Sequence, residues 1–130
     1  MEHGNAKFYM PFRPETCSEK LEIPKWFKWL WGDFVDVIPT EVILRNRLMN
    51  TWRVGITKIG ESLYFKNGWA NFVADNSIKT GDYMVFRFDG YGPFEVLVLG
   101  VDDLTDWDKA IIRMDEEDEE TQTQGERKTI

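Results

Sequence analysis

The sequence contains one cysteine and one histidine, and this scarcity excludes several kinds of site. Cys17 cannot form a disulfide bond within the chain, and a lone cysteine cannot build a CxxC metal motif. His3 lies close to the start of the sequence, where chains are usually frayed. The sequence therefore predicts no structural zinc site and no histidine-based catalysis. We expect Cys17 to be a small loop residue rather than a redox switch.

Long apolar runs are also absent, since no stretch of about 18 apolar residues could cross a bilayer. The opening residues MEHGNAKFYM lack the basic and then apolar order of a secretory signal. No carboxylate pair, Gly-rich phosphate loop or nucleophile elbow is evident, and the glycines within 89–92 indicate a hairpin turn. We therefore expect a soluble, non-exported protein that is not an enzyme and has no cofactor, metal, membrane partner or small-molecule substrate.

Basic residues are fewer than acidic ones: the chain has 16 Lys and Arg and 23 Asp and Glu, which gives a net charge of -7. The deficit is uneven: residues 1–105 carry 12 basic against 14 acidic side chains, and residues 106–130 carry 4 against 9. Residues 115–130 begin with six consecutive carboxylates and contain no aromatic ring, which predicts a disordered acidic tail. Residues 45–66 are locally basic, so the net charge alone does not exclude a nucleic-acid partner.

Apolar periodicity predicts many short strands and few helices. In 51–59, for example, Trp52, Val54 and Ile56 alternate with polar or small residues, which indicates one core face and one polar face. Gly60 can supply the positive φ of the tight turn that follows. The predicted strands are residues 7–12, 21–23, 41–46, 51–59, 62–65, 83–88 and 93–99.

Two short helices complete the pattern. Residues 24–32 begin with Pro24 at a first helical position and end at Gly32, with an apolar face of Phe27, Leu30, Trp31 and Phe34. A second helix is expected after the turn residues Asn67 and Gly68, with Trp69, Phe72 and Val73 on one face, and a further turn spans 79–82. The tryptophans at 26, 29, 31, 52 and 69 are expected to pack in the core or at its edge.

Seven short strands with frequent turns and two brief helices favour a mainly β fold, a closed or half-closed barrel rather than a sandwich. The order LEIPxxF, then TWxV, then YFKNGWANFVADNSIKTGDYMVFRFDG and FEV strongly resembles the plant-specific B3 DNA-binding domain, in its reproductive-meristem subtype. The resemblance covers residues 7–101. It implies a seven-stranded open β-barrel, the B3 pseudobarrel, with a helix near each end.

The resemblance also implies a nuclear protein that regulates transcription in plants by gripping duplex DNA in the major groove. Two loop arms would hold the groove, one between the first and second strands at 13–20, and one between the fourth and fifth strands at 57–62. Cations in and near them suit phosphates, and hydroxyls suit base edges. The candidate DNA-binding residues are Arg13, Thr16, Ser18, Lys20, Lys25, Arg53, Thr57, Lys58, Ser62 and Lys66.

Three carboxylates, Glu15, Glu19 and Glu61, lie in the same arms and would repel phosphates unless they accept from cytosine or orient a neighbouring cation. An alternative function therefore stays open: a B3-fold protein-interaction module with weak or non-sequence-specific DNA binding. The sign of the surface potential between the arms separates the two.

The domain prediction has four parts: a flexible N-terminus at 1–6, a B3-like domain at 7–104, a C-terminal helix at 105–114 and the acidic tail at 115–130. Thr105 is a candidate N-cap with Asp108 three residues on, as in a capping box. Trp107, Ile111 and Met114 share the apolar face of this helix, which could contact the barrel, a protein partner or a second copy in a homodimer.

Overall fold

The computed structural model describes residues 6–34, 38–88, 90 and 92–114. The chain divides into two compact units, residues 1–99 and residues 100–130, which we describe separately. The described residues of the first unit form a β-sheet and three helices.

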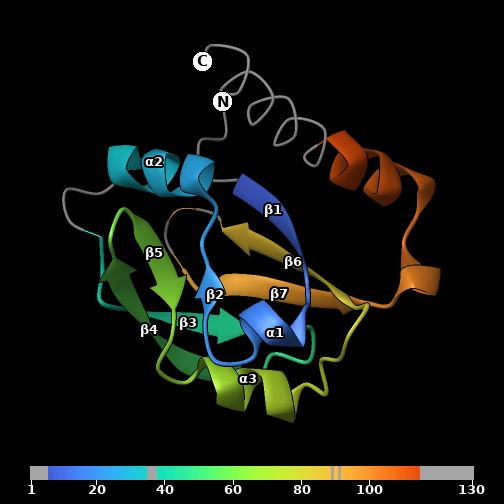
Figure 1. Cartoon of the computed structure of the whole chain (residues 1–130), viewed down its shortest axis with the longest axis horizontal. Helices are drawn as coiled ribbons and strands as arrows, with labels where there is room; N and C mark the ends of the chain where they lie inside the picture. The colour runs from blue at the N-terminus through green and yellow to red at the C-terminus, as the bar shows by residue number, and fades with distance from the viewer. Residues whose placement is uncertain (1–5, 35–37, 89, 91, 115–130) are drawn as a thin grey trace. The chain divides into compact units, whose positions relative to one another are not determined.

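The first unit is built on a single seven-stranded sheet that curls into an open half-barrel (Figure 1). Its strands are β1 (Ala6–Pro11), β2 (Leu21–Glu22), β3 (Glu41–Arg45), β4 (Thr51–Ile59), β5 (Ser62–Phe65), β6 (Tyr83–Phe88) and β7 (Phe94–Leu99). The spatial order is β1-β6-β7-β3-β4-β5-β2, and every pair is antiparallel except β3 with β7. All seven predicted strands are confirmed, each bound within one residue of its prediction.

Both predicted helices of this unit are present, but their number and bounds need correction. The helices are α1 (Pro14–Cys17), α2 (Lys25–Phe34) and α3 (Trp69–Asp75). The short α1 lies in the first arm, where the sequence predicts a loop. Pro14 begins this helix, because a first helical position needs no N–H donor. The expected stop at Gly32 is wrong, since α2 continues two residues further to Phe34.

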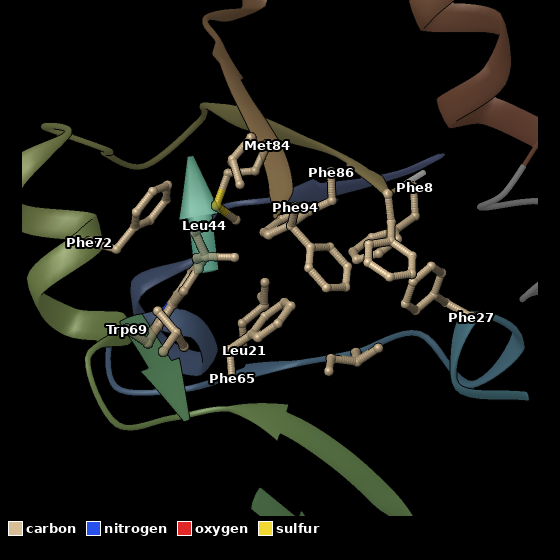
Figure 2. Packing of buried hydrophobic residues seen from close by; sticks show 14 of the residues in the cluster. Phe8, Leu21, Phe27, Leu44, Phe65, Trp69, Phe72, Met84, Phe86 and Phe94 are labelled. Atoms are coloured by element: carbon tan, nitrogen blue, oxygen red, sulfur yellow. The ribbon is translucent and has the colours of Figure 1, made fainter. Parts of the chain in front are cut away.

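The core consists mainly of aromatic rings contributed by strands and helices on the inside of the half-barrel (Figure 2). Phe86 stacks on Phe8 with a centroid distance of 4.8 Å and on Phe65 with one of 5.5 Å. Trp69 of α3 stacks on Phe65 and on Phe72 with centroid distances of 6.0 and 5.6 Å. Such rings bury large apolar areas, so the helices are fixed to the sheet by the same cluster that closes it.

The tryptophan prediction is only partly right. Trp31 and Trp69 are buried, and Trp52 packs edge-on against Phe72 at 5.0 Å between ring centroids. Trp26 is half exposed, and Trp29 is 74% exposed. Trp29 was misassigned because it lies two positions from both Phe27 and Trp31, which puts it on the opposite side of the helix.

Turn chemistry follows the predicted glycines. Gly60 has φ +64 between β4 and β5, and Gly68 has φ +88 immediately before α3. A β-carbon on Gly68 would lie 2.3 Å from the backbone oxygen of Arg53, so this glycine also permits the close approach of α3 to β4. In the third turn, Lys79 donates its backbone N–H to the carboxylate of the buried Asp82 at 3.0 Å.

The second unit contains a 3₁₀ turn at Val101–Asp103 and a helix at 106–114. The predicted capping box is confirmed: Asp108 donates its N–H to Thr105 Oγ1 at 3.0 Å, and the N–H of Thr105 donates to Asp108 Oδ2 at 3.1 Å. The predictions for residues 1–5 of the N-terminus and for the tail at 115–130 lie outside the described residues. Among the described helices, none is long and apolar enough to cross a membrane.

Candidate nucleic-acid interface

Half of the candidate residues lie on or at the end of the outer face of β2, β5 and β4, which we call the β2–β5–β4 face. Along β5, Leu63 and Phe65 are buried while Ser62 and Tyr64 are half-buried. Along β4, Val54 is fully buried, so alternation places Arg53 and Thr57 on the other side. The alternate side chains of these strands therefore pack in the core, and the side chains between them face outward and form a continuous polar surface.

Three cations lie on this face. Arg53 is exposed on β4, and its guanidinium is 3.9 Å from Glu41, a distance that leaves it largely available to other partners. Lys20 precedes Leu21, whose antiparallel partner across the sheet is Phe65, and Lys66 follows Phe65, so both lysines leave the same end of the β2–β5 pair. The face thus contains two lysines at one end and an arginine on the neighbouring strand β4.

Tyr64 orients one of these cations. The ammonium nitrogen of Lys20 lies 5.7 Å from the centroid of the Tyr64 ring, within the range of a cation–π contact. Across the sheet Tyr64 pairs with Thr57 on one side and with Glu22 on the other. An aromatic ring therefore occupies the middle of the face and holds a lysine over it.

The first arm, 13–20, is ordered by α1. The backbone oxygen of Arg13 accepts hydrogen bonds from the N–H groups of Thr16 and Cys17 at 3.0 and 2.7 Å. The indole Nε1 of Trp69 donates to the backbone oxygen of Cys17 at 2.6 Å, which ties α1 to α3. Ser18 follows at the helix end and is exposed. Cys17 itself is buried and helical, so its prediction as a loop residue is wrong.

Most of the second arm, 57–62, is β-strand rather than loop. β4 runs to Ile59 and β5 starts at Ser62, so only a two-residue turn projects. The hydroxyl of Ser62 donates to Glu22 Oε2 at 2.7 Å, and Lys28 of α2 donates its ammonium to the backbone oxygen of Glu61. These contacts fix the turn to β2 and to α2.

The two arms lie at opposite ends of the β2–β5–β4 face rather than side by side. The first arm ends at Lys20, beside Lys66, whereas the turn of the second arm lies beyond Ser62 at the other end of β5. Four residues of strand separate the two rows, or about 13 Å at about 3.3 Å per residue. That spacing is close to the width of the DNA major groove, about 12 Å.

Two predicted residues lie away from this face. Lys58 shares the alternation of Val54 and Ile56, so it leaves β4 on the other side, and it is exposed. Lys25 begins α2 and is exposed. Lys58 is itself part of the second arm, and Lys25 lies about one helical turn before Lys28, which contacts that arm.

Sequence reasoning missed two residues of this face, Tyr64 and Glu22, and one residue that borders it, Lys28 of α2. The alternation within SLYF would have identified Tyr64, since Leu63 and Phe65 have core composition. Lys28 and Glu22 carry no local signal, because both join the surface through contacts about 33 and 40 residues away in sequence. Glu22 also adds negative charge to a face that otherwise carries three cations.

The described residues contain no group of three or more His, Cys, Asp or Glu side chains that could hold a metal ion. Buried side-chain polar atoms without a hydrogen-bond partner are likewise absent from the described part. The groups that this face presents are cations, hydroxyls, one aromatic ring and the carboxylate of Glu22.

The family model and the similar proteins indicate the same family. The sequence model of the B3 DNA binding domain matches residues 14–102. The chain is 33% identical over 116 residues to the B3 domain-containing protein REM21 of Arabidopsis thaliana, a match covering 89% of this chain and 34% of that protein. It is 35% identical over 97 residues to the B3 domain-containing protein At1g16640 of the same plant, covering 75% of this chain and 70% of that protein. The chain thus spans about a third of the length of REM21.

Solved structures have the same fold. The structure of the hypothetical Arabidopsis thaliana protein At1g16640.1 superposes with a TM-score of 0.65 at 34% identity, over 77% of this chain and 95% of that one. The Arabidopsis FUS3-DNA complex superposes with a TM-score of 0.51 at 11% identity, over 71% of this chain and 94% of that one. At that identity the second likeness establishes the fold alone.

Proposed function

The chain belongs to the B3 DNA-binding domain family, and we propose that it binds duplex DNA through the β2–β5–β4 face in the major groove. On this proposal it is a DNA-binding domain of a plant protein that regulates transcription in the nucleus. Relatives in Arabidopsis and rice are named as B3 domain-containing proteins, which supports a plant setting.

One observation carries the proposal: Lys20, Arg53 and Lys66 converge on a single outward face that is closed at each end by an arm. Residues far apart in the sequence supply the three cations, so their convergence results from the strand register. The spacing of about 13 Å between the rows at the two ends suits the groove width, and a cationic face suits a polyanion.

The residues divide into two roles in this proposal. Cations at the rim, Arg13, Lys25 and Lys58, contact phosphates and set the register of the protein on the duplex. Side chains with hydroxyls lie nearer the face and suit base edges: Thr16, Ser18, Thr57 and Ser62. Thr16 and Ser62 already make local hydrogen bonds, so they would exchange or share these bonds on binding.

A protein-interaction module on the same fold is the second candidate function. The observation that favours it is the carboxylate content of the surface, where Glu22 accepts from Ser62 and Glu61 forms the tip of the second arm. These groups reduce the attraction for phosphates. A module of this kind would bind DNA weakly or without sequence preference.

A salt titration of the full chain with a random duplex distinguishes the two functions. If binding neutralises about 4 to 6 phosphates, the logarithm of the association constant falls with the logarithm of salt concentration at a slope of about -4 to -5. Lys66→Ala is expected to weaken binding to all duplexes and to reduce the slope by about one. Arg47→Ala is the matched control, because it removes one exposed cation from the β3–β4 turn, outside the β2–β5–β4 face.

Two results would contradict the proposal. The first is no duplex binding at low salt, which favours the interaction module. The second is an equal loss of DNA affinity in Lys66→Ala and Arg47→Ala, which would mean that net charge and not this face decides binding. If the duplex binds as expected, selection from a random duplex pool would show whether binding is sequence-specific.

A further inference from the structure

A second surface of the half-barrel carries a cluster of charges that the proposed DNA contact does not use. A hollow of about 300 Å³ opens on the outer side of β1, β6, β7 and β3. Four cations line it, namely Lys7, Arg45, Arg47 and Arg87, together with one carboxylate, Glu95. We call it the β7 hollow. In the strand order of the sheet, β1, β6 and β7 lie at one end and β5 and β2 at the other; the strands are labelled in Figure 1.

Strand register produces this cluster. Lys7 pairs with Arg87, Arg87 pairs with Glu95, and Glu95 pairs with Arg45, so four charges form one row across four strands. Glu95 accepts from Arg45 at 2.5 Å and also from Arg87, which holds both guanidinium groups against the sheet. One carboxylate among four cations leaves a local charge of +3, in a chain whose net charge is -7.

The floor of the β7 hollow is aliphatic. Val85 and Leu97 are partners across β6 and β7, on the side opposite the core residues Met84 and Phe86. Val85 is only 8% exposed although it faces away from the core. Met49 contributes to the rim. Apolar floor and cationic rim together suit a ligand that has an aliphatic group flanked by negative charges.

The β3–β4 turn forms a wall that is already fixed in place. The side-chain oxygen of Asn46 accepts from the N–H groups of Leu48 and Asn50, each at 3.0 Å. Its amide group donates to Asn76 at 2.9 Å, which attaches the turn to the end of α3. Met49 has φ +72, a conformation that such a network must maintain. A wall that is ordered before binding lowers the entropic cost of holding a ligand.

We propose that the β7 hollow binds an acidic peptide segment of another protein, with an aliphatic side chain on the floor and carboxylates against Arg47, Arg87 and Lys7. Charge complementarity supports this occupant, because four cations and only one carboxylate line the β7 hollow in a chain whose net charge is -7. Among all the residues that the structure describes, Glu95 included, Arg47 forms no ion pair, so it can receive a ligand carboxylate directly.

Nucleic acid fits the β7 hollow less well. The lining contains no aromatic ring on which a base could stack. Its one neutral polar side chain, Asn46, uses both its oxygen and its amide group to hold the turn, so it is not free to pair with an adenine edge. An aliphatic floor offers nothing to a phosphate.

The test uses the full chain and a fluorescein-labelled ten-residue peptide of alternating Leu with Asp or Glu. Two control peptides separate the contributions: one has Asn and Gln in place of the acids, and the other has Ser in place of Leu. We expect anisotropy to show binding of the first peptide only. Arg47→Ala should weaken it about twofold to fivefold without changing the DNA salt slope. Lys66→Ala should leave peptide binding unchanged.

Four outcomes would overturn the proposal. The first is no binding of the acidic apolar peptide at low salt, and the second is equal binding of the Ser-containing peptide. The third is an equal loss of DNA and peptide affinity in Arg47→Ala, which would assign the β7 hollow to the DNA interface. The fourth is self-association of the full chain that Arg47→Ala abolishes, measured by sedimentation, because that result assigns the hollow to the acidic run of a second copy.

Discussion

The indole nitrogen of Trp69 donates a hydrogen bond of 2.6 Å to the backbone oxygen of Cys17, and this bond joins the core to the first arm. The two residues are 52 positions apart in the sequence. The carbonyl oxygen belongs to the last residue of α1, where a helix leaves its oxygens without partners inside the helix. Core packing of α3 therefore fixes the position of α1 within the first arm.

We expect Trp69→Phe to lower the free energy of unfolding by about 1–3 kcal/mol, because it removes this buried bond and leaves a void beside Phe65. Trp52→Phe is the control, since Trp52 Nε1 donates to Asp75 at 2.8 Å in an exposed place, and its loss should cost about 1 kcal/mol or less. Amide exchange at Cys17 and Ser18 distinguishes the two variants. Exchange should accelerate in Trp69→Phe only. Equal protection in both variants would mean that the bond from Trp69 to Cys17 does not hold the arm.

A second prediction concerns the glycine that precedes α3. Gly68→Ala should destabilise the fold by about 3 kcal/mol or more, because φ is +88 and the new β-carbon would meet the backbone oxygen of Arg53. Gly81→Ala has a similar φ of +93 but no atom within 4 Å of the added carbon, so it should cost only about 1 kcal/mol. Urea midpoints at constant m-value measure both. Equal shifts would show that backbone conformation, and not the contact with β4, makes Gly68 necessary.

The strands were predictable because their signal is local. Alternation in 51–59 and 62–65 fixes which side chains face the core, and Gly60 marks the turn between them. The same locality explains the capping box at Thr105, whose partner is three residues away. Each feature needs only neighbouring residues, so a single sequence contains all of its evidence.

The site was less predictable because its parts meet through long-range register. Nothing near Lys20 in the sequence indicates that Tyr64 lies beneath it, since only the pairing of β2 with β5 brings them together. The short α1 was missed for a related reason: four residues carry too little periodicity, and Cys17 is buried by contact with distant elements. The parallel pairing of β3 with β7, which creates the row around Glu95, has no sequence signal of its own.

The ion-pair row gives a prediction on pH. Hydrogen bonds from Arg87 and then Arg45 lower the pKa of Glu95 below its ordinary value. A carboxylate with a lowered pKa in the folded state stabilises the fold fully above its unfolded pKa of about 4.3, and this contribution is lost as the pH falls through the lower folded value. Because the side chain is 39% exposed, solvent screens the pairs and Glu95→Gln should cost only about 1 kcal/mol at pH 7.

The measurement is the difference in unfolding free energy between the wild type and Glu95→Gln from pH 7 to pH 3. That difference should shrink below about pH 4.3. Glu19→Gln removes another exposed negative charge and corrects for the change in net charge. A difference that stays constant down to pH 3 would contradict the assignment of the lowered pKa to these two arginines.

The last prediction tests whether Tyr64 serves DNA binding by holding Lys20. Tyr64→Leu keeps an apolar side chain at this position but removes the ring, so the ammonium loses a cation–π contact and regains its freedom. Duplex affinity at low salt should then fall about twofold to fivefold, the equivalent of about 0.5–1 kcal/mol. Tyr64→Phe keeps the ring and should bind as the wild type does.

A double-mutant cycle decides whether the effect passes through the lysine. In a Lys20→Ala background, Tyr64→Leu should have almost no further effect on affinity, because the cation that the ring orients is already gone. Additive losses would mean that the ring contacts DNA itself. If Tyr64→Phe is as weak as Tyr64→Leu, the phenolic hydroxyl is the functional group, and Tyr64 belongs with Thr57 and Ser62 among the hydrogen-bonding residues of the face. Unfolding midpoints of all variants must agree for the affinities to be compared, since the ring also packs on the sheet.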